Sequence, residues 1–329
     1  MGIKSLTSLI QKKSPESIKT ISLYTLKEKK VAIDTNIFLY RSLANVRANG
    51  DYLRNKDGHV VSHIVGMFNN AMKYLQFGIE PIYIFDGKPP IEKKEVLDER
   101  KKKASESKEL SEKSLTIEEK QKHEKNSIRV KSFHVNDVKK LFNLMGVSYI
   151  HPNGEAEAYA SELCRIGYVD YVVTEDMDSL VFGCPRMIRT CLDKSIKRND
   201  VVSVIDLETT LKNFNMNMSE FTDMCILCGC DYCPTIPGVG TIRSYNHIQK
   251  YKNIEELLNS GKCVNIPDEF KERYKMSREL FNVFREKIDI NNMNICSSEY
   301  QKEKLTEYLI KECSMNEKRV SKTLDKIKL

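Results

Sequence analysis

The sequence predicts an α/β fold in which helices flank a mostly parallel central sheet. Three short runs rich in β-branched and aromatic residues have the composition of buried parallel strands, at residues 31–33, 82–85 and 171–173. Each run leads into acidic residues, at Asp34, Asp86 and Asp176. Because the carboxyl ends of parallel strands share one edge of the sheet, where ligands bind in open α/β folds, these side chains are expected to converge there.

The remaining elements follow from the pattern of apolar residues along the chain. Residues 1–90 predict the order helix, strand, helix, strand, with a polar turn at 55–58 and a helix from about 62 to 77. Residues 136–178 predict helix, strand at 147–150, helix and strand, and further short strands lie around Ile188 and at 201–205. After Leu211 the pattern is mostly helical, including a helix at 219–229 with Cys225 and Cys228 on its apolar face.

Residues 91–135 differ in composition from both neighbouring segments. They hold 13 Lys or Arg and 10 Asp or Glu with few large apolar side chains, so they can contribute little to a core. An exposed, salt-bridged helical insertion is the expected structure. Its first half is basic, at Lys93, Lys94 and residues 100–103. Because this half directly follows the loop of Asp86, it is expected to reach over a site at that edge of the sheet.

The composition indicates one large domain or two closely associated ones. Its 329 residues are 40% hydrophobic, which is enough for a substantial core. No apolar run approaches the ~20 residues that cross a bilayer, and no signal peptide opens the chain, so we expect an intracellular protein without membrane association. Its ten cysteines are expected to be mostly reduced thiols.

Seven acidic residues lie where predicted strands or helices begin or end: Asp34, Asp86, Glu155, Glu157, Asp176, Asp178 and Asp231. Singly, each also fits a structural role, as a helix cap, in a turn, or at the positive end of a helix. A cap needs one acid, however, whereas Glu155/Glu157 and Asp176/Asp178 are doubled, and such crowding is repulsive without cations. The pattern favours two divalent metal ions, and oxygen-only ligation indicates Mg²⁺ or Mn²⁺.

The charge balance suits a polyanionic partner. The net charge is +7, from 53 basic and 46 acidic residues, and turning seven acids inward to metals would leave about +14 facing solvent. Lysine-rich solvated surfaces are common, so charge alone does not identify nucleic acid as the partner. Support has to come from motifs.

Two further motifs give weaker signals. Cys225, Cys228, Cys230 and Cys233 form two C-x-x-C pairs separated by one residue, whereas zinc ribbons separate their pairs by ~15 to 20 residues, so we expect core cysteines there. The sequence Ile-Pro-Gly-Val-Gly at 236–240, followed by an amphipathic helix, predicts a glycine hairpin whose N–H groups grip a phosphate without reading a base. Alone it is usually a plain turn, but it follows Asp231 within ten residues, beside the predicted metal site.

These motifs together resemble the flap endonucleases of the structure-specific 5′ nuclease superfamily. MGIKSL, VAIDTN, the GD-L-N-G-SH-GMF pattern of residues 50–68, YIFDGKPP, GEAEA, TEDMD, the C-I-L-G-DYC pattern of residues 225–233 and GVG occur in the family's order and spacing. The resemblance is strong over residues 1–254 and fades in the C-terminal helices. It implies a PIN-like nuclease core with a helical arch and a helix-two-turn-helix module, and it places metal ligands on the same seven carboxylates.

The resemblance also assigns roles to single residues. Lys93 and Arg100 match the basic arch residues that act on the scissile phosphate, together with the metal ligand Asp178. Tyr40 matches the tyrosine that stacks on a base next to the cut, although its helix alone would place it in the core. A potassium ion at the hairpin would be held by the backbone carbonyls of Thr235, Ile236 and Val239. The residues predicted to contact DNA are Tyr40, Arg47, Gly238, Gly240 and Arg243.

The implied segments are residues 1–90 and 136–215 for the two parts of the nuclease core, 91–135 for the arch, 216–260 for the helix-two-turn-helix module and 261–329 for a C-terminal helical region. Asp86 and Glu155 are 69 positions apart, which fits a compact arch and excludes the several-hundred-residue insertion of nucleases that cut bubbles. The sequence differs from the family pattern in three places. The stretch at 241–243 has fewer basic residues, Val60 and Val61 replace small polar residues, and no C-terminal clamp-binding peptide precedes Leu329.

The function expected from these features is two-metal hydrolysis of DNA at junctions of 5′ single-stranded flaps with duplex, with 5′ to 3′ exonuclease activity, in replication, repair or recombination. The expected protein is a monomer that acts without a sliding clamp, in the nucleus or at a cytoplasmic replication site. Two alternatives stay open: a 5′ exonuclease acting on RNA or nicked DNA, and a catalytically silent protein that binds DNA junctions.

Overall fold

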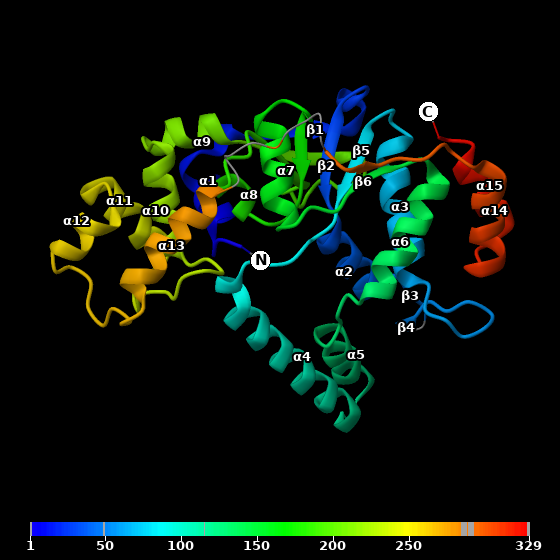
Figure 1. The fold of residues 1–329 in the computed structure, drawn as a ribbon, viewed down its shortest axis with the longest axis horizontal. Helices are drawn as coiled ribbons and strands as arrows, with labels where there is room; N and C mark the ends of the chain where they lie inside the picture. The colour runs from blue at the N-terminus through cyan, green and yellow to red at the C-terminus, as the bar shows by residue number, and fades with distance from the viewer. Residues whose placement is uncertain (1, 49, 115, 284–287, 289–292, 328–329) are drawn as a thin grey trace.

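An eight-stranded sheet forms the centre of the computed structural model, which describes residues 2–48, 50–114, 116–283, 288 and 293–327 (Figure 1). The strand order is β1-β9-β8-β7-β2-β5-β6-β10. The five strands from β8 to β6 are parallel to one another, and β9, β1 and β10 pair antiparallel at the two sides. The strands are β1 (Ile18–Ser22), β2 (Lys30–Asp34), β5 (Glu80–Ile84), β6 (Ser148–Ile150), β7 (Tyr171–Val173), β8 (Arg186–Thr190), β9 (Val201–Asp206) and β10 (Ile295–Cys296).

Successive side chains of a strand point to opposite faces of the sheet, and each face has its own hydrophobic core. In β2, for example, Ala32 belongs to one hydrophobic core, whereas Val31 and Ile33 belong to the other. The predicted α/β class with a mostly parallel central sheet is confirmed, as are the strands at 31–33, 82–85, 147–150, 171–173 and 201–205 within one or two residues. A short antiparallel pair, β3 (Arg47–Ala48) with β4 (Asp51–Tyr52), was not predicted, because two-residue strands leave no periodicity.

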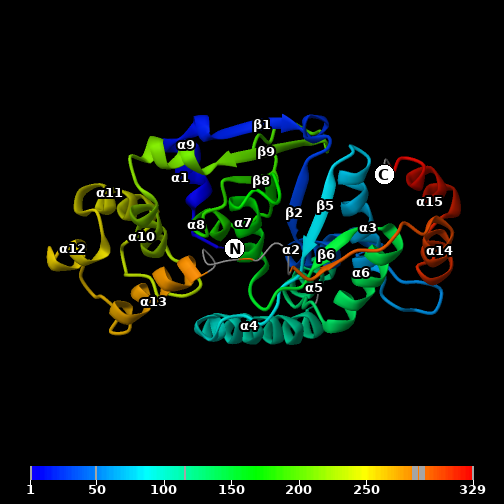
Figure 2. The same cartoon turned by 45° about the horizontal axis from the view of Figure 1, so that its top comes forward.

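Helices cover both faces of the sheet (Figures 1 and 2). The helices whose buried residues pack into the core of Ala32 include α1 (Leu6–Lys13), α7 (Ala156–Arg165), α8 (Asp178–Val181), α9 (Leu207–Phe214) and α10 (Met218–Cys228). Those that pack into the core of Val31 are α2 (Thr35–Asn45), α3 (Ser62–Leu75), α6 (Ser132–Met145), α14 (Lys302–Glu307) and α15 (Glu317–Leu324). Short turns of helix connect them: η1 (Pro15–Ser17), η2 (Leu23–Leu26), η3 (Ile91–Lys93) and the π-helical turn η5 (Tyr308–Glu312).

The charged insertion forms two helices that project from the carboxyl edge of the sheet (Figure 1). They are α4 (Lys94–Lys113) and α5 (Ile117–Asn126), and they pack against each other as an arch. In α4, only Ala104 and Ser111 are buried, as the polar composition predicted. The arch is tied to α2 at its far leg, where the Tyr40 hydroxyl donates to the carbonyl of Lys125 over 3.2 Å.

The helical module that follows the sheet lies at one end of the molecule, opposite α14 and α15 (Figure 1). It contains α10, α11 (Thr241–Tyr251), α12 (Ile254–Asn259) and α13 (Phe270–Val283). The buried carboxylate of Asp223 on α10 accepts two hydrogen bonds from Arg278 on α13, and Arg278 also binds Glu255 on α12. In the C-terminal region, α13 therefore lies at one end of the molecule, whereas α14 and α15 lie at the other. Among the described residues, no helix is long and apolar enough to cross a membrane.

Candidate active site

The predicted carboxylates gather at the carboxyl edge of the parallel strands, below the arch. Asp34 ends β2, Asp86 lies two residues beyond β5, and Glu155 and Glu157 lie at the start of α7. Asp176 lies between β7 and α8, Asp178 is the first residue of α8, and Asp231 follows α10. All are buried except Asp86 and Asp231, which are partly accessible. The parallel topology thus brings together residues that are far apart in the sequence, as the strand pattern predicted.

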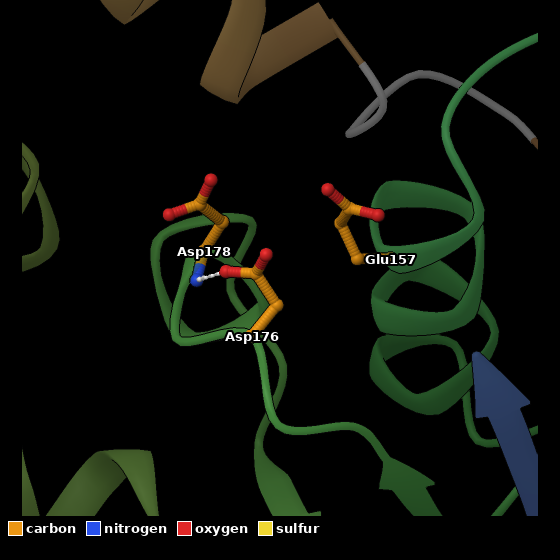
Figure 3. A group of neighbouring side chains, drawn as sticks. All are labelled: Glu157, Asp176 and Asp178. Atoms are coloured by element: carbon orange, nitrogen blue, oxygen red, sulfur yellow. Dashed lines mark hydrogen bonds between the residues drawn. The ribbon is translucent and has the colours of Figure 1, made fainter. Parts of the chain in front are cut away.

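Glu157, Asp176 and Asp178 form the tightest group of acids among the described residues (Figure 3). Each offers a carboxylate oxygen, and these oxygens lie within 4.8 Å of one another. The backbone N–H of Asp178 donates to Asp176 over 3.2 Å, whereas neither carboxylate oxygen of Asp178 has a hydrogen-bond partner in the described chain. A buried carboxylate without a partner is costly in free energy. The geometry of this carboxylate group therefore fits a bound cation. Because all of its donor atoms are oxygens, the cation it fits best is a hard divalent metal ion.

The electrostatics of this group point in the same direction. Burial, reinforced by the neighbouring Asp176, raises the pKa of Asp178 well above its usual value, and burial does the same for Glu157. Burial and the nearby Asp86 raise the pKa of Asp34 to about 7. Without a cation the site therefore holds protons that a divalent metal would displace.

Neutral residues fix the acids on the other side of the site. The Thr174 hydroxyl donates to Asp34 over 3.0 Å, while Asp86 accepts from the Asn36 amide over 2.5 Å and from the backbone of Ala156 over 2.9 Å. Such bonds orient each carboxylate and leave its remaining lone pairs for another ligand. Asn36 and Thr174 were not predicted as site residues, although they lie inside the motifs VAIDTN and TEDMD.

The arch places two basic side chains directly on these acids. The Lys93 ammonium, which is itself buried, contacts Glu155 and lies 3.7 Å from Glu157 and 3.6 Å from Asp231. Burial lowers the pKa of Lys93, but the carboxylates of Glu157 and Glu155 outweigh burial and raise it overall. Arg100 donates to both oxygens of Asp231, at 2.9 and 2.8 Å. In this state the arch neutralises part of the acidic site.

Glycine at position 2 allows the N-terminal segment to approach the acids. A Cβ atom on Gly2 would lie 1.8 Å from a carboxylate oxygen of Asp176 and 2.7 Å from one of Asp178, so no side chain fits there. A cavity of about 440 Å³ opens beside this residue, lined by Gly2, Lys4, Arg100, Arg189 and Asp231 among others. Its basic side chains beside the acidic group suit a phosphate that approaches bound metal. Sequence reasoning missed Gly2, since close approach by the backbone leaves no pattern.

Two of the predicted DNA contacts lie where α2 meets the arch. The Tyr40 side chain is 37% exposed, so it is not a core aromatic. The Arg47 side chain is almost fully buried: its guanidinium donates to the carbonyls of Ala44 and Gly50 and pairs with Glu124 of α5 at 3.3 Å. The structure thus places Arg47 in the contact between α2 and the arch, and its role in binding DNA stays a prediction.

The glycine hairpin forms as predicted, between α10 and α11. Gly238 has a φ of 78°, a conformation that favours glycine, and the N–H of Val239 donates back to the carbonyl of Ile236 over 3.0 Å. Arg243 donates to the carbonyl of Gly238 over 2.6 Å. The hairpin also touches the N-terminal segment, because the Thr241 hydroxyl at the start of α11 donates to the carbonyl of Lys4 over 2.9 Å. Lys4 and Gly2 thus link this hairpin to the acidic site.

An open α/β sheet with buried carboxylates gathered at its carboxyl edge, under a basic arch, defines a metal-dependent nuclease. The family model described as XPG N-terminal domain matches residues 1–107, and that described as XPG I-region matches residues 146–231. Flap endonuclease 1 of Glycine max is 38% identical over 336 residues, which cover 100% of this chain and 87% of that protein. The chain belongs to the flap endonuclease family.

Other known proteins agree with this membership. Flap endonuclease 1 of Cryptosporidium parvum is 38% identical over 346 residues, which cover 100% of this chain and 70% of that protein. The solved structure of flap endonuclease-1 from Methanococcus jannaschii superposes with a TM-score of 0.69 at 29% identity, over 94% of this chain and 95% of that one. The catalytic core of Rad2 in complex with DNA substrate shares the fold, with a TM-score of 0.73 at 20% identity over 99% of this chain and 100% of that one.

Proposed function

We propose that this flap endonuclease hydrolyses the phosphodiester bond at the junction between a single-stranded 5′ flap and duplex DNA, with two Mg²⁺ ions for which Mn²⁺ can substitute. The observation that carries the proposal is the buried group of Glu157, Asp176 and Asp178, with an unpartnered Asp178 carboxylate beneath two basic arch residues. The family membership supports the substrate class. A site complete within one chain supports a monomer.

Each group in the site has a distinct part in this mechanism. The seven carboxylates would hold the two metals, which supply activation of a water and neutralisation of the leaving oxygen. Lys93 and Arg100 would leave their carboxylate partners and donate to the scissile phosphate, where negative charge develops. Tyr40, whose hydroxyl donates to the Lys125 carbonyl of the arch, would stack on a base next to the cut. No side chain has to act as a covalent nucleophile.

The hairpin would grip the duplex at a distance from the cut. The carbonyls of Thr235, Ile236 and Val239 would hold a potassium ion, which passes its charge to a phosphate, and the N–H groups around Gly238 and Gly240 would add to this grip. Such contacts position the duplex without reading its sequence. The turn geometry at Gly238 supports this assignment.

Single-turnover cleavage of matched DNA and RNA flaps, with and without Mg²⁺, tests the proposal. We expect metal-dependent cleavage at the DNA junction. Lys93→Ala and Arg100→Ala should each slow the chemical step by about 100-fold or more while changing flap affinity little, as is usual for groups that stabilise developing charge. Lys101→Ala is the matched control, because Lys101 is an exposed lysine that follows Arg100 on α4 and its replacement should leave the rate unchanged.

Three results would contradict the proposal. Faster cleavage of the RNA flap would indicate a 5′ exonuclease of RNA. Tight junction binding without any metal-dependent cleavage would indicate a silent binding protein. If the Lys93 and Arg100 variants lose flap affinity but keep the rate of the chemical step, the arch only attracts DNA electrostatically and does not act on the transition state.

A further inference from the structure

Tyr232 connects the arch lysine to a carboxylate of the metal site. It directly follows Asp231, is almost fully buried, and donates its hydroxyl hydrogen to one carboxylate oxygen of Glu155. The other oxygen of Glu155 accepts from Lys93. The Lys93 ammonium also lies over the Tyr232 ring, 5.7 Å from its centroid. One tyrosine therefore contacts both the arch lysine and the acid that this lysine neutralises.

The ring of Tyr232 is held by an aromatic column. It packs edge to face on Phe281 of α13, with ring centroids 5.2 Å apart, and Phe281 packs in the same way on Phe182 at 5.1 Å. Phe182 comes directly after α8, the short helix that begins at Asp178. Edge-to-face pairs fix ring orientation beyond what buried area alone provides. The Tyr232 hydroxyl is thus aimed at Glu155 by packing that also supports the segment of Asp178.

The hydroxyl can act only as a donor to Glu155. A carboxylate offers acceptor oxygens, so the hydroxyl hydrogen of Tyr232 is directed at Glu155. A hydrogen bond from a buried hydroxyl to a carboxylate fixes the rotamer of that carboxylate. Polar groups with this relation to a metal ligand usually set its basicity and orientation.

We propose that Tyr232 is a positioning residue for Glu155, holding this carboxylate oriented so that its second oxygen can take either Lys93 or a divalent metal. The inference rests on the proposed function, since only then is Glu155 a metal ligand. It further implies that the Lys93 ammonium and the metal compete for one oxygen of Glu155, which Tyr232 keeps facing the site.

The test is Tyr232→Phe, which removes the hydroxyl and keeps the ring in the aromatic column. Calorimetric titration with Mn²⁺ in the absence of DNA should show metal affinity weakened by about 10-fold, the lower end for groups that support metal ligands. The Mg²⁺ concentration for half-maximal single-turnover cleavage should rise by a similar factor. Flap affinity and the thermal midpoint should stay close to wild type, and saturating metal should restore much of the rate.

Tyr274→Phe is the matched control. The Tyr274 side chain is also buried, and its hydroxyl also donates to a carboxylate, that of Glu255, over 3.1 Å. Tyr274 lies in the helical module, however, and not among the proposed metal ligands. Removing this hydroxyl should leave metal affinity unchanged. A double-mutant cycle with Glu155→Gln adds a second measurement, because the two changes in metal affinity should be strongly non-additive if Tyr232 acts through Glu155.

The outcomes separate this inference from the proposed function. Metal affinity of Tyr232→Phe within twofold of wild type, or additive changes in the cycle, would overturn the positioning role while wild-type cleavage stands. If the wild-type protein neither binds Mn²⁺ nor cuts flaps, the proposed function itself fails. Should Tyr232→Phe fold poorly, the affinity of Glu155→Gln for Mn²⁺ still tests the inference. An affinity equal to that of wild type would show that Glu155 does not bind the metal, and this would overturn the positioning role of Tyr232.

Discussion

Asp178 combines full burial with two carboxylate oxygens that accept no hydrogen bond from the described residues. We predict that Asp178→Asn lowers single-turnover cleavage by at least about 1,000-fold, equivalent to about 4 kcal/mol, because it removes a metal ligand. Flap affinity should change little, since Asp178 is not a proposed phosphate contact. Without metal, the variant should melt no lower than wild type, because burying a neutral amide costs no more than burying the protonated acid that burial favours at this position. Near wild-type turnover in saturating Mg²⁺ would contradict the two-metal assignment.

Asp34 makes the metal-free protein sensitive to pH. Its pKa rises from 3.8 to about 7 on folding, so the folded state binds the proton more tightly than the unfolded state does. This contribution to stability is complete below about pH 3.8 and is lost as the pH rises to about 7. We therefore predict that the metal-free thermal midpoint, relative to that of Asp34→Asn, falls between pH 5 and pH 7.5.

Divalent metal should reverse this trend, because it binds the deprotonated carboxylates and its affinity therefore rises with pH. Thermal melts of both proteins, with chelator and with Mg²⁺, measure the effect. Parallel pH curves for the wild type and Asp34→Asn would show that Asp34 titrates normally.

At the scale of single residues, the sequence pointed to the seven acids and two arch residues that the structure brings together, but it missed Lys4, Arg189 and several neutral residues beside them. The carboxylates could be found because acids at strand ends are doubled and follow apolar runs. Tyr232, Asn36, Thr174 and Gly2 act through hydrogen bonds or close approach, which exist only after distant segments meet. For the same reason the sequence could not show that Arg47 is buried against Glu124 of the arch.

At the scale of elements, the helical module depends on one ion-pair network. The Arg278 guanidinium joins α13 to the fully buried Asp223 of α10 and to Glu255 of α12, at 2.5 to 2.7 Å. We predict that Arg278→Met lowers the free energy of unfolding by about 3 kcal/mol, the lower end for breaking a buried pair, since Arg278 keeps some contact with solvent. Urea denaturation measures the change.

The exposed pair of Lys302 with Asp325, at 3.1 Å, provides the control. Lys302→Met should leave the urea midpoint unchanged, because exposed ion pairs contribute little. Equal effects of the two variants would contradict a special role for the network. The helical pattern after Leu211 predicted that α10 to α13 exist, but it could not predict which of their charges would be buried together.

At the scale of the whole molecule, the acidic site and the glycine hairpin are joined by the N-terminal segment and are predicted to bind one DNA at two places. We predict that duplex affinity falls linearly with the logarithm of salt concentration, with a slope of about −0.9 per phosphate neutralised, and does not depend on base composition. Replacing K⁺ with tetramethylammonium at equal ionic strength should weaken binding. Unchanged affinity in fluorescence anisotropy titrations would remove the support for a potassium site.

The overall architecture could be predicted only in part. Strand composition indicated a parallel sheet with ligands at one edge, and this edge is where the acids lie. The strand order could not be read from the sequence, because the antiparallel additions β1, β9 and β10 depend on pairings between distant segments. The family resemblance, more than periodicity, predicted the arch and the module that follows the sheet.

The strand order has a consequence for how the chain folds. β1 ends at Ser22, whereas its partner in the sheet, β9, begins only at Val201. Similarly, β2 pairs on one side with β7, which begins at Tyr171. During synthesis on a ribosome, β1 therefore emerges long before β9, and β2 can pair with β5 but has no partner at its other edge until β7 exists. Pairings this distant make folding slow and leave unpaired strand edges exposed in the meantime. The nascent protein thus passes through a period in which it needs protection from aggregation, before any of its chemistry can begin.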